Sequence, residues 1–175
     1  MNKKYEINEK DGDKVRYVLG NRSNNPLFAI GLNCSTATDE KSDPTLSRIE
    51  KLAEKNGFGS FIMLNLYPLR STKPKNLPTA DNDDLIVKNA EVIEKFLKDY
   101  SKLSVLACWG ANIKKKKYLS KSLNLLLEKM KDKEIDWKAI KLTESKHPHH
   151  PIGTSCGELI GFDVEKYIKE LGGSK

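Results

Sequence analysis

The sequence predicts an α/β fold, a three-layer α/β/α sandwich with a mostly parallel central sheet. Continuous apolar runs, typical of strands that are buried on both faces, alternate along the chain with amphipathic helical patterns. Parallel neighbours need such crossover helices, because each strand must start from the same edge of the sheet. With 175 residues, no internal repeat and no long linker, we expect a single α/β domain over 1–175, in which 1–13 form a loosely ordered N-terminal segment.

Five segments have the pattern of a strand. Residues 27–32 form a continuous apolar run after turn-forming residues at 21–26, and residues 60–66 repeat the apolar run. Such a run indicates a strand of a parallel sheet that is covered on both faces. The predicted strands, in chain order, are 14–19, 27–32, 60–66, 103–108 and 137–142.

Four segments have apolar residues at helical spacing. In the first, Asp43 supplies an N-cap, Pro44 suits the first turn, and the Asn-Gly pair at 56–57 ends the helix. The last helix ends at the two glycines of residues 172–173. The predicted helices are 44–55, 83–100, 119–130 and 163–171.

The balance of charge favours an anionic partner. The chain has 31 Lys and Arg against 24 Asp and Glu, a formal net charge of +7, and clustered cations attract phosphates. The densest cluster, the tetralysine, is a candidate nucleic-acid-binding surface and consists of Lys114, Lys115, Lys116 and Lys117. The cluster is either a plain solvated face or a surface that binds DNA or a nucleotide. The sequence assigns no protein partner and no oligomeric state.

Nothing in the sequence indicates a membrane or an oxidising compartment. No apolar stretch approaches the roughly 20 residues that a membrane span needs, and residues 1–10 lack the apolar region of a signal peptide. Cys34, Cys108 and Cys156 are widely separated and form no CxxC pair, which argues against a disulfide framework and a four-thiolate metal site. We therefore expect a cytoplasmic protein with reduced thiols and no membrane partner.

Ligands of α/β folds bind beyond the carboxyl ends of the strands, so we expect the chemistry in the loops that follow the strands. These loops are residues 33–43, 65–83, 109–117 and 143–157. Two of them offer small residues with exposed backbone amides. Gly31, Asn33 and Ser35 belong to a turn that could bind a polar ligand or position a water, while Trp109 and Gly110 precede the tetralysine. Ordinary turn residues and a core tryptophan are the alternatives.

The loop at 65–83 begins with groups that suit a nucleotide. Asn65, at the end of a buried strand, can read a base edge, Tyr67 can stack on a ring, and Arg70 can hold a phosphate or carboxylate. The alternative is a strand-end asparagine that satisfies backbone groups and a tyrosine that is packed in the core.

The last loop holds every histidine of the chain. His147, His149 and His150 lie between prolines at a strand end, where imidazoles can shuttle protons or donate to developing negative charge. A metal site would recruit Cys156, but adjacent histidines without helical spacing argue against one, so we expect no metal and no cofactor. A thiol nucleophile would require Cys34 to meet one of these histidines.

Several short motifs resemble the bacterial and phage "domain of unknown function 1643" family over residues 16–151. The first motif usually reads Leu-Asn-Pro-Ser in that family, and Cys34 takes the place of the proline here. The motifs are IGLNCSTA at 30–37, SDPT at 42–45, NLY at 65–67, LR at 69–70, KP at 73–74 and WG at 109–110.

The order of the loops is also similar, more distantly, to the uracil-DNA glycosylase superfamily. This resemblance implies a water-positioning place for Asn33, a base-reading place for Asn65, and a late loop, beginning at His147, that stabilises the departing base anion. His149 stands where that loop normally has serine, and no acidic residue follows Gly31 to activate water. The iron–sulfur cysteines of some subfamilies are absent.

Three hypotheses follow from the residues and the resemblance. The first is a glycosylase-like protein that binds a nucleobase in a nucleic acid or nucleotide and hydrolyses its N-glycosidic bond, with Asn33, His147 and His149 as catalytic residues. The second is a non-catalytic module of the same fold that binds nucleic acid or protein, which the missing acid favours. The third is a metal-dependent hydrolase built on the three histidines.

Overall fold

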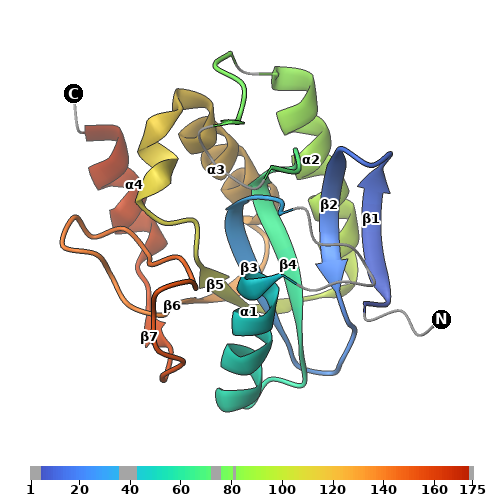
Figure 1. The fold of residues 1–175 in the computed structure, drawn as a ribbon, viewed down its shortest axis with the longest axis vertical. Coiled ribbons are helices and arrows are strands. Elements are labelled where there is room, and N and C mark those ends of the chain that lie inside the picture. Colours follow the sequence, from blue (N-terminus) through green and yellow to red (C-terminus); the bar gives the residue numbers. More distant parts are fainter. Residues whose placement is uncertain (1–4, 36–42, 72–75, 81, 174–175) are drawn as a thin grey trace.

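The computed structural model describes residues 5–35, 43–71, 76–80 and 82–173, and a seven-stranded sheet forms its centre (Figure 1). The strands lie across the sheet in the order β1-β2-β4-β3-β5-β6-β7. Their bounds are β1 (Ile7–Asp11), β2 (Val15–Gly20), β3 (Pro26–Asn33), β4 (Ser60–Tyr67), β5 (Lys102–Ala107), β6 (Glu134–Ala139) and β7 (Ile160–Gly161).

The four central strands are parallel, and antiparallel strands extend the sheet at both edges. β3 pairs in parallel with β4 and β5, and β5 pairs in parallel with β6. β1 pairs antiparallel with β2, β2 with β4, and β6 with β7. The predicted α/β class is confirmed, but the sheet is mixed, and the expectation of a mostly parallel sheet holds only for its four central strands.

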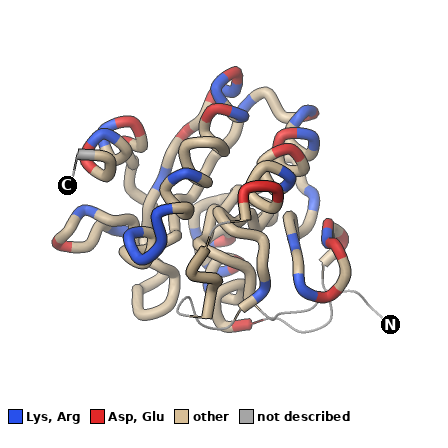
Figure 2. Tube along the Cα trace, turned by 90° about the horizontal axis from the view of Figure 1, so that it is seen from above, with Lys and Arg blue, Asp and Glu red and all other residues tan. Residues whose placement is uncertain are grey.

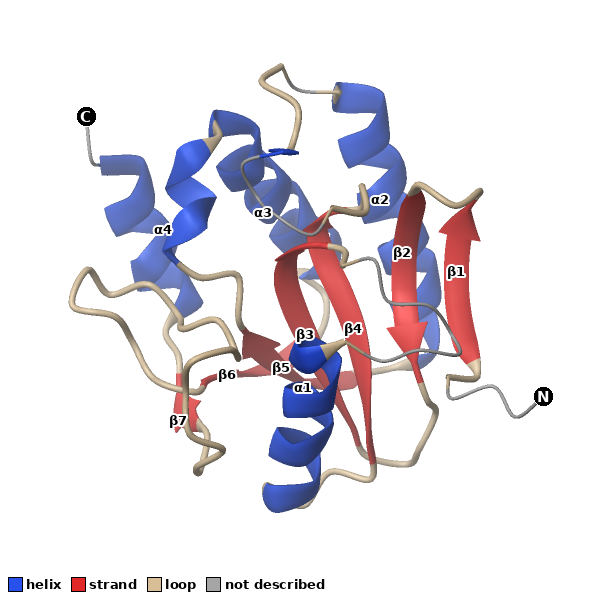
Figure 3. Ribbon diagram, viewed as in Figure 1, coloured by secondary structure: helices blue, strands red, loops and turns tan. Residues whose placement is uncertain are grey.

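Helices and apolar strand residues form two hydrophobic clusters. On β3, Leu27 and Ala29 belong to a cluster with α1, whereas Phe28 and Ile30 belong to a cluster with α2, α3 and α4, because successive side chains of a strand point to opposite faces. Figure 3 shows α1 on one side of the sheet and α2 and α3 on the other. The helices are α1 (Pro44–Lys55), α2 (Asp83–Phe96), α3 (Lys117–Met130) and α4 (Val164–Gly173), with short 3₁₀ helices η2 (Leu97–Asp99) and η3 (Ala111–Lys115).

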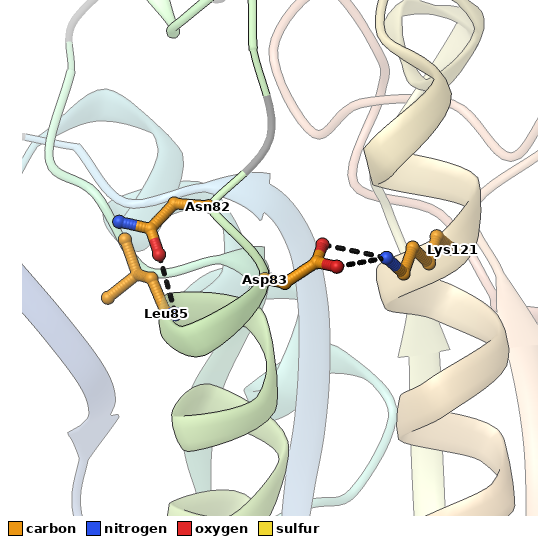
Figure 4. A network of polar contacts seen from close by, with 4 residues as sticks. All are labelled: Asn82, Asp83, Leu85 and Lys121. Atoms are coloured by element: carbon orange, nitrogen blue, oxygen red, sulfur yellow. Dashed lines mark hydrogen bonds and ion pairs between the residues drawn. The ribbon is translucent and has the colours of Figure 1, made fainter.

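Capping side chains fix where the helices begin. Asp43 caps α1 by accepting a hydrogen bond from the Leu46 amide at 2.8 Å, and Pro44 occupies the first turn, as predicted. Asn82 caps α2 in the same way through Leu85 (Figure 4). The same figure shows the Asp83 carboxylate bound to Lys121 of α3, which ties the starts of the two helices together. This exposed pair contributes about 0–1 kcal/mol.

The structure differs from the predicted elements in four places. Within 1–13, residues Ile7–Asp11 form β1. This strand was not predicted because an edge strand buries few side chains, so its composition is polar and lacks the apolar pattern of a strand. β6 begins at Glu134, three residues before the predicted 137–142, and β7 has only two residues. The helix predicted over 83–100 ends at Phe96 and continues as η2. Within the described ranges, no helix combines the length and apolarity needed to cross a membrane.

Candidate functional site

A cavity of about 280 Å³ lies at the carboxyl ends of the central strands. It receives residues from the ends of β3, β4 and β5, from the start of α1 and from the histidine loop. From the predicted site residues, the cavity gathers Gly31, Asn33, Ser35, Asn65, Trp109, Gly110 and His149. Residues that are more than 100 positions apart in the chain therefore contribute to one site.

Asn65 and Gly31 are neighbours in the parallel register of β4 and β3. A Cβ atom on residue 31 would lie 2.9 Å from Asn65 Oδ1 and 2.4 Å from the Met63 Cε methyl. Glycine therefore leaves the space that the Asn65 amide occupies beside the cavity. The Asn65 side chain is only 1% exposed, and its Oδ1 has no hydrogen-bond partner within the described part of the chain.

The other end of the Asn65 amide is held by a thiol. Asn65 Nδ2 donates a hydrogen bond to Cys34 Sγ at 3.1 Å, and Cys34 Sγ donates one to the Arg16 carbonyl oxygen at 2.8 Å. Burial raises the pKa of the Cys34 thiol to about 11, although the nearby Arg16 charge acts in the opposite direction. The thiol is therefore protonated at neutral pH and is a poor nucleophile.

Asn33 is fixed by backbone groups of two loops. Its Nδ2 donates to the carbonyl oxygens of Cys34 at 3.0 Å and Ser71 at 2.9 Å. The Ser71 amide in turn donates to the Cys34 carbonyl at 2.8 Å, so the segment after β4 is tied to the turn after β3. Both hydrogens of the Asn33 amide have acceptors, and within the described part of the chain its oxygen accepts no hydrogen bond.

Arg16 of β2 also lines the cavity, and sequence reasoning missed it. Its side chain is 3% exposed, and its guanidinium donates to Ser35 Oγ at 3.4 Å. Burial lowers the pKa of Arg16, while the Asp43 charge raises it. The guanidinium remains charged because its ordinary pKa is above 12. The sequence signal that could have identified Arg16 is a cation within the apolar pattern of a strand. Arginine is seldom fully buried without a partner, so such a residue indicates a buried polar site.

Two histidines stand at the mouth of the cavity. His149 is partly exposed, and its amide donates to the Lys141 carbonyl at 3.0 Å. His150 Nδ1 accepts from the Ile152 amide at 3.2 Å. Desolvation lowers the pKa of His150, and the Asp43 charge opposes that shift. Asp43 thus acts electrostatically on both Arg16 and His150, a role that its prediction as an N-cap did not include.

Gly110 allows the chain to turn beside these histidines. Its φ is 70°, in the left-handed region that favours glycine. A Cβ atom there would lie 3.6 Å from His150 Cβ, which is ordinary contact, so the backbone angle requires the glycine and the available space does not.

His147 lies outside this cavity and lines a second one of about 110 Å³, together with Lys114 and Tyr167. It is 3% exposed, and its Nδ1 is 2.8 Å from the Tyr167 hydroxyl, which accepts from Trp109 Nε1 at 3.2 Å. The hydroxyl hydrogen is then free to donate to His147 Nδ1, which favours the neutral imidazole with its proton on Nε2. Burial lowers the pKa of His147, and the Lys114 charge lowers it further.

Two further predicted ligand residues have structural contacts. Tyr67 is 1% exposed and lies in the core, with its ring centroid 5.0 Å from that of Tyr118. The Arg70 guanidinium donates to the backbone oxygens of Ser35 at 3.3 Å and Asp13 at 3.2 Å. Neither side chain is among those that line the cavity.

The thiols and histidines do not form a metal centre in the described part of the chain. There, no three His, Cys, Asp or Glu side chains lie close enough together to hold an ion. Cys108 lines the cavity but donates to the Ile30 carbonyl at 3.2 Å, and burial raises its pKa to about 12. Cys156 is more exposed and does not line the cavity.

The tetralysine forms the end of η3 and the start of α3, and it is the longest continuous blue segment in Figure 2. Lys116 is partly exposed and the other three lysines are exposed. In the described part of the chain, no carboxylate forms an ion pair with any of the four. The segment follows Asn112, which lines the cavity, so the basic surface begins within a few residues of the site.

Comparison with known proteins gives a family and no assigned activity. Neither a curated protein nor a solved structure matches the chain. A protein family does, and its sequence profile covers all of β2 except Val15, the cavity-lining loops and the histidines. Since the match extends over residues 16–152, the chain belongs to the family described as "Protein of unknown function (DUF1643)".

Proposed function

We propose that this protein binds a single nucleobase of a nucleic acid or nucleotide in the cavity and hydrolyses its N-glycosidic bond. The observation that carries the proposal is the convergence of the β3, β4, β5 and histidine loops on one cavity. The predicted resemblance to uracil-DNA glycosylases, and with it a three-layer α/β/α sandwich, belongs to this proposal. Helices on both sides of the sheet support it.

The cavity suits a small planar ligand. Its volume of about 280 Å³ is at the lower end of the roughly 300–1,000 Å³ of ligand pockets, which favours one base over a longer piece of nucleic acid. Leu46, Met63 and Trp109 supply apolar walls, and Asn65 supplies a buried polar group. A base that is flipped out of a strand needs this combination of stacking surface and edge recognition.

Each polar group has a role in the proposed reaction. Asn33 Oδ1 positions the attacking water, and the water oxygen adds to the anomeric carbon as the bond to the base breaks. The electron pair of that bond leaves with the base, and the proton that the water loses passes to solvent. Arg16 places a fixed positive charge in the cavity and stabilises the departing base anion. His149, at the mouth, donates a proton to that anion. His147 acts through Tyr167 and Trp109, which it holds in position.

The tetralysine supplies the contact to phosphate. It lies beyond Asn112 at the rim of the cavity, and its charges have no carboxylate partners in the described part of the chain. Lysines in this position can neutralise the backbone on either side of a flipped nucleotide.

A second candidate is a binding module without catalysis. The described residues that line the cavity include no Asp or Glu, so none of these side chains supplies a carboxylate to activate a water. Such a module would retain oligonucleotides through the same cavity and the same basic surface.

An assay of release and retention distinguishes the two candidates. Single- and double-stranded oligonucleotides that carry cytosine, uracil, adenine or hypoxanthine at one position are incubated with the protein, and free base and bound strand are measured in the same samples. An Ala111→Trp variant places a large ring at the mouth of the cavity, and Val87→Trp on the exposed face of α2 is the control.

Base release that is lost in Ala111→Trp and kept in Val87→Trp supports the glycosylase. Retention without release, with the same dependence on Ala111, supports the binding module. Activity that is equal in both variants places the function elsewhere and overturns the proposal.

A further inference from the structure

We infer that Cys34 fixes the orientation of the Asn65 amide, so that the cavity selects a nucleobase with an exocyclic amino group over the same ring with a carbonyl group. The inference rests on the proposed function, because it assumes that a base occupies the cavity. It assigns Cys34 as a positioning residue for specificity, although its thiol neither lines the cavity nor reacts.

The Cys34 thiol has a single hydrogen to donate. Cys34 Sγ donates that hydrogen to the Arg16 carbonyl oxygen at 2.8 Å, so the sulfur can only accept from its other neighbours. One neighbour is the Arg16 guanidinium, which has donors only. The other is the Asn65 amide at 3.1 Å, and only its NH₂ end can donate. A flipped amide would place Oδ1 against the sulfur lone pairs. The thiol is fully buried and its pKa is raised to about 11, so it keeps this hydrogen at neutral pH.

The opposite end of the Asn65 amide is its oxygen, Oδ1. With Nδ2 facing Cys34, Oδ1 points toward Gly31, where it lies 2.9 Å from the position that a Cβ would occupy, while Cγ lies 4.0 Å from it. Gly31 and Asn65 both line the cavity. Four buried side-chain polar atoms of the described part lack hydrogen-bond partners, and only Asn65 Oδ1 belongs to a residue of the cavity.

A buried carbonyl oxygen without a partner needs a donor, and leaving it unpaired in a complex is costly. An amino group projects from the ring and can reach a single acceptor. The ring N–H of a keto base is flanked by its own carbonyl oxygen, which would approach Oδ1 and find no donor there. Cytosine and adenine therefore fit better than uracil and hypoxanthine, which have the same ring shapes.

The test compares these isosteric pairs. Binding of cytosine, uracil, adenine and hypoxanthine to the full chain is measured by calorimetry at one salt concentration. We expect the amino base of at least one pair to bind about tenfold more tightly than its keto partner, the factor that corresponds to about 1.4 kcal/mol. In Cys34→Ala the Asn65 amide is free to turn. The ratio of the dissociation constants of the keto base and the amino base should then fall to about threefold or less.

Two variants separate specificity from stability. Cys34→Ser keeps one hydrogen and an acceptor, so it should restore the wild-type ratio. Cys156→Ala removes a thiol that does not line the cavity, so it should leave the ratio unchanged. Thermal unfolding of each variant shows that it is folded under the binding conditions.

The outcomes are distinct. A wild-type preference for the keto bases, or a ratio that is the same in Cys34→Ala and wild type, overturns this inference and leaves the proposed function in place. If the wild type binds none of the four bases and retains none of the oligonucleotides, the proposed function fails, and this inference fails with it.

Discussion

Gly31 is the residue at which the smallest change has the largest expected effect on the site. In Gly31→Ala the new methyl would meet Asn65 Oδ1 and the Met63 methyl, and only the Met63 side chain is flexible enough to move. We expect base binding to fall at least tenfold, while the free energy of unfolding falls by about 1 kcal/mol. Calorimetry and urea unfolding measure the two effects.

Gly161→Ala is the matched control, because a Cβ at residue 161 of β7 meets no atom within 4 Å. It should bind base like the wild type. Equal binding by both variants would mean that the Asn65 amide does not contact the ligand.

His147 should make stability depend on pH. Burial, with a contribution from the Lys114 charge, lowers its pKa in the folded protein below the ordinary 6.5. The unfolded chain therefore takes up the proton first as the pH falls, so the stability is fully present above about pH 6.5 and is lost below it. We expect the free energy of unfolding to fall between pH 7.5 and 5.5, and urea titrations at several pH values measure it.

A His147→Gln variant keeps a polar side chain without a titrating group. It should have a smaller fall over the same pH range, with the remainder arising from His150, whose pKa is also lowered by desolvation. An identical fall in variant and wild type would assign the effect to other groups.

Individual residues also show why the sequence predicted the site only in part. Parallel strand ends meet at one edge, so the sequence could place Asn33, Asn65 and His149 in neighbouring loops. Arg16 was missed because it lies in β2, an antiparallel strand for which the rule of carboxyl ends does not hold. His147 and His149 are two residues apart and yet line different cavities, which depends on the loop conformation and not on composition.

Among the elements, η3 and the start of α3 carry the expected nucleic-acid surface. Replacing Lys114 and Lys115 by glutamine should weaken oligonucleotide binding and reduce the slope of log K against log salt by about 0.7 to 0.9 for each lysine that contacts phosphate. Fluorescence anisotropy at several salt concentrations measures the slope.

The control replaces Lys51 and Lys55 of α1 by glutamine, the same change of charge at two exposed positions. Lys55 ends α1 just before β4 begins. It therefore lies near the amino ends of the parallel strands, whereas the cavity lies at their carboxyl ends. A slope that changes equally in the two double variants would show that only net charge matters.

Element by element, the predictions succeed where burial leaves a strong pattern. β3 and β4 are buried on both faces and α1 has a capping signal, so all three were found within two residues. β1 and β7 were not predicted. They lie at the edges of the sheet, where each pairs with one strand only and most side chains are polar or exposed, so no apolar pattern marks them. β6 alternates charged and apolar residues at its start, and this hid its first three residues.

For the whole molecule, the N-terminal strand is expected to be a substantial part of stability. Tyr5 is 1% exposed and Ile7 is 6% exposed, and the Tyr5 ring lies 5.9 Å from that of Phe61. Deletion of residues 1–13 removes both side chains from the core and exposes the edge of β2. At about 1.5–3 kcal/mol for each large side chain, the deletion should lower the free energy of unfolding by roughly 3–6 kcal/mol.

Urea unfolding measures this loss, and Tyr5→Phe, which keeps the ring, is the control and should lose no more than about 1 kcal/mol. A deletion that leaves stability unchanged would show that β1 does not pair with β2 in solution.

The bond from the Cys34 thiol to the Arg16 carbonyl has a further consequence. It joins the turn after β3 to the backbone of β2, and β2 holds β1 at the edge of the sheet. A ligand that orders Asn65 and Cys34 therefore also opposes local opening of this hairpin. Hydrogen exchange of the β2 amides should become slower when base is bound, while exchange in the distant β7 stays the same. Occupancy of the site would then also slow the opening of β1, a strand that contributes no residue to the cavity.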